Sequence, residues 1–335
     1  MWDEGLEIVH TPVLLDECLR CLSPVGETYE KNALMIDSTL GEGGHSDAFL
    51  SHFPDLRVLG IDRDGKIQSR ARERLSAYGG RMDFYNGWFD EFYADYPAQK
   101  ERPSLILFDL GISVYHYERS GRGFSFRHDE PLDMRLSGDE GRSAADIVNT
   151  EREEALADLI YLYSDERLSR RIARAICTAR TGGKIVSSRQ LADIIFDAVP
   201  AGYRHGAIHP ATRTFQALRI AVNSELRRLP RALHDAFNVL SVGGKMGVIT
   251  FHSIEDRIVK NFFRNLGRKC VCPAERADCI CGGEPCAEIL TRKPVEPTDG
   301  EIKSNPPSRS ARLRAVRKLR DASEQHRLRI ASEAM

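Results

Sequence analysis

Three aspartates each follow a short, mainly apolar run that has the character of a buried strand. They are Asp37, Asp62 and Asp109. The carboxyl ends of parallel strands form the ligand-binding edge of an open α/β sheet, so these carboxylates are expected to converge there. Carboxylates at such an edge can accept hydrogen bonds from ribose hydroxyls or face a cationic ligand. The pattern therefore predicts a cofactor site at this edge.

A glycine-dense turn, Gly41–Gly44, separates Asp37 from Asp62. Glycine permits positive φ angles and close approach of a ligand to the backbone. The G-x-G-x-x-G pattern of dinucleotide sites is absent, and a carboxylate at position 37 would repel a pyrophosphate. S-adenosylmethionine has no phosphate and presents a sulfonium and an amino group, both positive, so it fits better than NAD. An ordinary glycine turn is the structural alternative.

Composition limits the broad class of the protein. The 335 residues are enough for one large or two ordinary domains, and a formal net charge of −1 gives no global basic field. Arginine outnumbers lysine, which suits a nucleic-acid partner or reflects genome composition. With no export signal, no run of about 18 apolar residues, and eight cysteines expected to be reduced, we expect a cytoplasmic protein without a membrane segment.

The periodicity of apolar residues changes twice along the chain. Residues 1–136 and 230–320 alternate strand-like and helix-like segments, whereas 137–229 read as amphipathic helices. A terminal hairpin is expected from 288–291 and 310–316. A sheet closed by such a hairpin is typical of class I methyltransferases, so we expect that α/β fold, a Rossmann-like sheet, with an inserted all-α domain. Residues 321–335 form a C-terminal tail.

Two further segments suggest contacts. The irregular loop 121–136 offers Phe124 and Phe126 for stacking on a base and several arginines for phosphates, as a lid over a nucleobase would. The basic segment 309–320 has no acid and is expected to be the main phosphate contact outside the pocket.

Five cysteines crowd one segment. They are Cys270, Cys272, Cys279, Cys281 and Cys286. Tetrathiolate zinc prefers C-x₂₋₄-C pairs, whereas these are C-x-C pairs, so the metal signal is weak and reduced thiols in a loop are the alternative. We expect no metal in the catalytic site, and the pattern leaves zinc binding by this loop open.

Several short sequence motifs, spread over nearly the whole chain, together resemble those of one family. It is the ribosomal RNA small subunit methyltransferase H family, the 16S ribosomal RNA cytosine-N4 methyltransferases. The matching strings occur in the order of the family: His10–Leu15, Asp37–His45, Gly60–Asp64, Asp109–Ser113, Arg122–Phe126, Pro131–Arg135, His209–Arg213, Phe215–Asn223 and Phe251–Arg257.

The resemblance implies methyl transfer from S-adenosylmethionine to N4 of a cytosine in the decoding region of 16S rRNA. The partner is 16S rRNA, expected within the small ribosomal subunit, and the choice between free RNA and the assembled subunit stays open. The oligomeric state stays open, a homodimer included. The resemblance also implies a set of cofactor contacts in the first part of the chain: Gly43, Gly44, His45, Asp62, Phe89 and Asp109. His116 stands where the family often has glutamine, which leaves its role less certain.

Roles in the chemistry follow from position. Asp109 is the candidate for orienting the amine, with cofactor binding alone as the alternative. His252 ends a later strand and is expected to contact the base or relay a proton, with a hydrogen-bonded strand terminus as the alternative. The candidate substrate contacts are Phe124, His209 and Arg213. The alternative for His209 and Arg213 is that they lie on a solvated face of a helix.

Two other classes of protein remain. An NAD-linked oxidoreductase would bind NADH and not S-adenosylmethionine. A non-enzymatic RNA-binding or assembly factor would bind RNA normally and transfer no methyl group.

Overall fold

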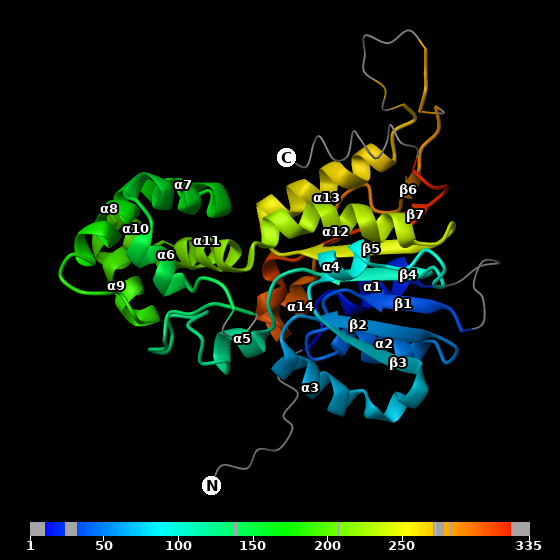
Figure 1. Cartoon of the computed structure of the whole chain (residues 1–335), viewed down its shortest axis with the longest axis horizontal. Helices are drawn as coiled ribbons and strands as arrows, with labels where there is room; N and C mark the ends of the chain where they lie inside the picture. Colours follow the sequence, from blue (N-terminus) through cyan, green and yellow to red (C-terminus); the bar gives the residue numbers. More distant parts are fainter. Residues whose placement is uncertain are drawn as a thin grey trace. The chain divides into compact units, whose positions relative to one another are not determined.

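The structure, a computed structural model, describes residues 11–23, 32–136, 138, 140–206, 208–270, 272, 278–281 and 283–322. The chain divides into two compact units (Figure 1). Unit 1 comprises residues 1–112 and 227–335, and unit 2 comprises residues 113–226. The insertion therefore begins well before the expected residue 137. The expected C-terminal tail from residue 323 onward lies outside the described residues, as does His10.

In the described part of unit 1, seven strands form one sheet in the order β3-β2-β1-β4-β5-β7-β6. Strands β1 to β5 are parallel to one another, and β7 runs antiparallel to both β5 and β6. The bounds are β1 Leu34–Asp37, β2 Arg57–Asp62, β3 Met82–Asn86, β4 Leu105–Asp109, β5 Lys245–Thr250, β6 Ala287–Ile289 and β7 Arg312–Lys318. The expected closing hairpin is confirmed in β6 and β7, and the sheet is that of a class I methyltransferase.

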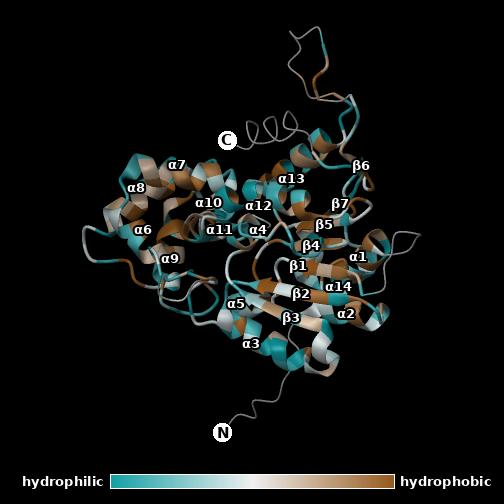
Figure 2. Ribbon diagram, turned by 45° about the vertical axis from the view of Figure 1, so that its right-hand side comes forward, coloured by the Kyte–Doolittle hydropathy of each residue, from teal (hydrophilic) through white to brown (hydrophobic). Residues whose placement is uncertain are grey.

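Helices cover both faces of this sheet (Figure 1). One face packs against α4 (Phe89–Ala94), α12 (Glu225–Val239) and α13 (Ser253–Leu266). The other packs against α1 (Leu15–Leu22), α2 (Gly44–His52) and α3 (Gly65–Arg74). Because β1 is buried at every position, it reads as a continuous apolar run, and Figure 2 colours it largely hydrophobic.

The first helix, α1, begins at Leu15, after Leu14 in the left-handed region at φ 54°. The amide of Leu14 donates to Oε1 of Glu301 at 2.8 Å, in the short helix α14 (Asp299–Ser304). This tertiary bond takes the residues before α1 out of the helix.

Unit 2 is helical, as expected. Its helices are α5 Val114–Glu118, α6 Ala144–Thr150, α7 Glu153–Ser164, α8 Ser169–Ala179, α9 Ser188–Ala198, α10 Ala201–Arg204 and α11 Ala211–Asn223. Buried side chains from α7, α8, α9 and α11 form its core: Leu156, Ile160, Ile172, Ile176, Leu191, Ile195, Phe215 and Leu218.

The loop 121–136 belongs to this helical unit, which explains the early boundary. The amide of Leu132 donates to the carbonyl of Val186 at 2.9 Å. The side chain of Asn223, 3% exposed, accepts from the amide of Leu136 and donates to the carbonyl of Met134. No helix among the described residues has the length and apolar character needed to cross a membrane.

Candidate active site

The glycine turn at the carboxyl end of β1 has a steric explanation within the protein. Gly41 and Gly43 have φ angles of 54° and 79°. A Cβ atom on Gly43 would lie 2.8 Å from Cδ1 of Leu75, and one on Gly44 would lie 2.5 Å from Cγ of Pro12. The turn therefore requires glycine at both positions before any ligand is considered. Their role as cofactor contacts stays a prediction.

Asp62 is fixed at the end of β2 by backbone amides. Its Oδ2 accepts from the amide of Gly41, and its Oδ1 from the amide of Asp64, each at 2.8 Å. Each carboxylate oxygen can accept more than one hydrogen bond, so the side chain is compatible with a ribose. The bond to Gly41 also couples the acid to the glycine turn.

The fold buries Asp37 and partly buries Asp109. Asp37 is 1% exposed and accepts from Oγ of Ser46 at 2.7 Å. Burial raises the pKa of its carboxyl to about 6. Burial, followed by the charges of Asp37 and Glu255, raises the pKa of Asp109 well above its ordinary value. Oδ1 of Asp109 is buried and accepts no hydrogen bond from the described residues.

His45 contacts Asp109 from the first turn of α2. Its Nδ1 lies 3.5 Å from Oδ2 of Asp109, and its Nε2 lies 3.0 Å from the carbonyl oxygen of Val13. A carbonyl can only accept, so Nε2 carries a proton, and one further proton satisfies the contact between Nδ1 and the carboxyl group. The amide of Asp109 donates toward Oγ1 of Thr39, which lies 2.6 Å away. The predicted site residues of β1, α2 and β4 thus form one network.

His252 is held by the start of its own helix. It caps α13, with Nδ1 accepting from the amide of Glu255 at 3.4 Å and Nε2 lying 3.0 Å from Oε1 of that residue. Oε2 of Glu255 accepts in turn from the amide of Phe251. This geometry fits the hydrogen-bonded strand terminus that was the alternative, and the catalytic role of His252 stays a prediction.

Phe89 begins α4 after β3, and its ring stands edge-on to that of Phe108 at 5.7 Å. It is half-buried, so it contributes to the core and still presents part of its ring. The neighbouring Trp88 was not among the predicted site residues. The guanidinium of Arg228 lies over the Trp88 ring at 4.2 Å, a contact made by distant segments that local patterns do not indicate.

In unit 2 the structure brings His116 and Phe124 together, with ring centroids 5.3 Å apart. Both residues are 4% exposed. The expectation that Phe124 is exposed for stacking is therefore wrong, because its loop folds onto the helical unit. Arg135 of that loop also makes two bonds to the carboxylate of Asp133 instead of presenting a free charge.

His209 lies just before α11 between two rings. Its centroid is 4.5 Å from that of Phe126 and 5.8 Å from that of Phe196, which is stacked with an interplanar angle of 20°. Partial desolvation lowers the pKa of His209. Phe196 was not expected in this group, since it belongs to α9.

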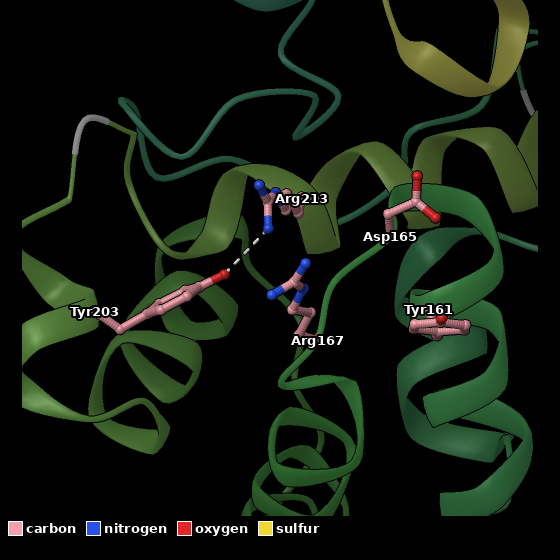
Figure 3. A pocket seen from close by; sticks show the side chains of 5 residues that line it. All are labelled: Tyr161, Asp165, Arg167, Tyr203 and Arg213. Carbon is pink, nitrogen blue, oxygen red and sulfur yellow. Dashed lines mark hydrogen bonds between the residues drawn. The ribbon is translucent and has the colours of Figure 1, made fainter.

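Arg213 lines a surface hollow of about 560 Å³ in unit 2 (Figure 3). The other lining residues are Tyr161, Asp165, Arg167 and Tyr203. Nη1 of Arg213 donates to Oη of Tyr203 at 3.3 Å, and Tyr203 donates to the fully buried carboxylate of Glu166. The hollow combines two guanidinium groups with two tyrosine rings, which suits a phosphate beside a base.

The basic segment 309–320 does not present the expected free cluster. Arg314 is 8% exposed and makes two bonds to the carboxylate of Asp256 at 2.7 and 3.1 Å. Lys318 is fully buried and donates to three backbone carbonyls, including those of Phe237 and Leu240 at 2.7 and 2.8 Å. Burial lowers the pKa of Lys318 to about 8. The proposed role of this segment as the main phosphate contact is therefore wrong for its central residues.

Comparison with known proteins extends over almost all of the chain. Residues 7–319 match the MraW methylase family. Ribosomal RNA small subunit methyltransferase H of Treponema denticola is 56% identical over 314 residues, which cover 94% of this chain and 98% of that protein. The proteins of the same name from Syntrophus aciditrophicus and Treponema pallidum are 43% and 41% identical; they cover 94% and 93% of this chain, and 99% and 93% of their own lengths. The chain is thus a member of the MraW methylase family.

Proposed function

We propose that this protein transfers a methyl group from S-adenosylmethionine to N4 of a cytosine in the decoding region of 16S rRNA. The methylase family and the rRNA methyltransferase names of its relatives support this proposal. S-adenosylmethionine is the methyl donor of this methylase fold. The oxidoreductase alternative loses its basis, because the family is one of methylases.

The acidic edge of unit 1 fits a cationic methyl donor. Asp109 has a buried oxygen without a hydrogen bond from the described residues, and burial, followed by the charges of Asp37 and Glu255, raises its pKa. A sulfonium or ammonium group close to Asp109 would favour the charged form of this carboxyl group. In this proposal Asp62 holds the ribose, while the turn at Gly43 and Gly44 and the ring of Phe89 line the site. His116 stays a predicted cofactor contact.

The chemistry needs positioning more than a strong base. The lone pair on cytosine N4 is delocalised into the ring, so the amine must be held with that lone pair in line with the methyl group. When bound, S-adenosylmethionine supplies the methyl group and a neutral sulfide leaving group. The carboxylate of Asp109 accepts an N–H of the amine and orients it. We assign this role to Asp109 and not to His252, because Glu255 holds the ring of His252.

The RNA contacts are proposed for unit 2. The guanidinium of Arg213 lies at the hollow of Figure 3, where it can pair with a phosphate. His209, with exposed ring surface, extends an aromatic group formed with Phe126 and Phe196. The part of Phe124 in this proposal is to support His116, since its own ring is buried.

The observation that carries the proposal is Asp109 beside His45, with one carboxylate oxygen buried and the side chain still 18% exposed at the end of β4, in a chain of this family. The test is mass mapping of 16S rRNA from cells with and without the gene. We expect one decoding-region cytosine to lose one methyl group from its base when the gene is absent. Identical 16S maps from both strains would overturn the proposal.

A further inference from the structure

Four thiols converge in the segment that joins α13 to β6. The Sγ atoms of Cys270, Cys272, Cys279 and Cys281 all lie within 4.8 Å of one another. These cysteines are thiols and not disulfides. The fifth cysteine of the segment, Cys286, is buried and does not join the group.

Three of the sulfur–sulfur separations match the edges of a tetrahedron around one metal ion. They are 3.8 Å from Cys270 to Cys279, 3.5 Å from Cys279 to Cys281, and 3.6 Å from Cys281 to Cys270. Zinc–sulfur bonds of about 2.3 Å in tetrahedral geometry place the sulfurs about 3.8 Å apart. A disulfide would need about 2.05 Å. An iron–sulfur cluster places inorganic sulfide between its ligands and spreads the thiolates further than a single ion does.

Burial does not explain the convergence. Cys270 and Cys279 are exposed, so neither is a core residue placed by the hydrophobic effect. Two of the three short separations join opposite C-x-C pairs, so the pairs face each other across a common centre. The short C-x-C spacing is therefore compatible with a tetrathiolate site, because each pair contributes two corners of the tetrahedron.

The end of the segment is anchored to the last residue of α13 and to Arg320, which follows β7. The guanidinium of Arg320 donates to the carbonyl oxygens of Cys281 and Glu284, and the amide of Cys286 donates to the carbonyl of Leu266 at 2.8 Å. Between α13 and β6 the described residues contain no helix or strand. A metal cross-link would therefore tie together described residues that no helix or strand connects.

We propose that Cys270, Cys272, Cys279 and Cys281 bind one zinc ion as a closed tetrathiolate site that orders the segment between α13 and β6. Soft thiolate ligands in a tetrahedron select zinc over magnesium or calcium. Four protein ligands leave no position for water or substrate, so the site is structural. It is separate from methyl transfer.

The first test is the zinc content of the full-length protein, purified under reducing conditions and measured by elemental mass spectrometry. We expect about one zinc per chain, and less than about one-tenth in Cys279→Ser, because a tetrathiolate site needs all four ligands. Cys279 is exposed, so its substitution should leave the fold intact. The matched control is Cys177→Ser, which replaces a half-buried cysteine of α8. This variant should retain zinc. Unchanged binding of S-adenosylmethionine to Cys279→Ser would confirm that unit 1 is folded.

The second test does not depend on any variant folding. Metal-stripped wild-type protein is titrated with Co²⁺, and we expect saturation at about one ion per chain with the visible spectrum of tetrahedral thiolate cobalt. The proposal is overturned if wild-type protein holds no zinc and binds no Co²⁺. It is also overturned if the Cys270→Ser/Cys279→Ser double variant keeps its zinc, or if the purified protein contains an iron–sulfur cluster.

Discussion

Nδ1 of His45 lies 3.5 Å from Oδ2 of Asp109, and the other nitrogen of the ring faces the carbonyl of Val13 at 3.0 Å. The carbonyl fixes one proton on the ring, so the contact with Asp109 depends on a second proton that either partner can carry. A cationic ligand at this edge would favour the charged form of Asp109. The pair thus links the protonation state of the site to the binding of the methyl donor.

Asp109→Asn keeps the shape of the side chain and removes its charge. Since the carboxylate orients the amine in the proposed mechanism, we expect single-turnover methyl transfer to slow by at least about 100-fold. The raised pKa means that ionised Asp109 costs stability, so the variant should melt at the same or a higher temperature near neutral pH. Asp83→Asn, on the exposed side of β3, is the control. Near-normal turnover would rule out an essential carboxylate.

Asp37 should make stability depend on pH. Its pKa is about 6 in the folded protein against an ordinary 3.8, so the folded state holds the proton more tightly. The resulting stabilisation is complete below about pH 4 and is lost as the pH rises through about 6. The difference corresponds to at most about 3 kcal/mol. Melting temperatures of wild type and Asp37→Asn, measured between about pH 4.5 and 8, should converge at low pH and favour the variant at high pH. Parallel curves would contradict this account.

Asp62→Ala should weaken the binding of S-adenosylmethionine by about 1.5–3 kcal/mol, as for a lost pair of charge-assisted hydrogen bonds. The substitution also releases the amides of Gly41 and Asp64, so part of the loss would come from a looser turn. Asp62→Asn keeps one acceptor oxygen and should lose less. The measurement is calorimetric titration, and an unchanged dissociation constant for the alanine variant would remove Asp62 from the site.

Arg314 and Arg317 on β7 should behave differently. Arg314→Gln removes the closer partner of the buried carboxylate of Asp256 and leaves it only the half-exposed Arg312 at 3.5 Å, which costs up to about 3–5 kcal/mol of stability. Arg317 pairs with Glu288 at an exposed position, so Arg317→Gln should cost about 0–1 kcal/mol. Denaturant unfolding measures both. If Arg314→Gln instead left stability intact and flattened the salt dependence of RNA binding, the segment would be an RNA contact after all.

The strand ends could be predicted from the sequence because continuous apolar runs in a parallel sheet end at one edge. Asp37, Asp62 and Asp109 occupy such ends as expected. The burial of Arg314 and Lys318 could not be predicted, since their partners lie far away in the chain and a basic strand looks the same whether paired or solvated. The orientation of His252 depends on Glu255, one turn later, which its position after a strand does not reveal.

The most direct test of the account is methyl transfer by the purified protein to small ribosomal subunits from cells that lack the gene. S-adenosylmethionine with a labelled methyl group is supplied, and the 16S rRNA is then digested and mapped by mass spectrometry. The account predicts one labelled methyl group on N4 of a single decoding-region cytosine with wild-type protein, and almost none with Asp109→Asn. Label on another atom or another RNA, or no label with wild-type protein that binds S-adenosylmethionine, would contradict it.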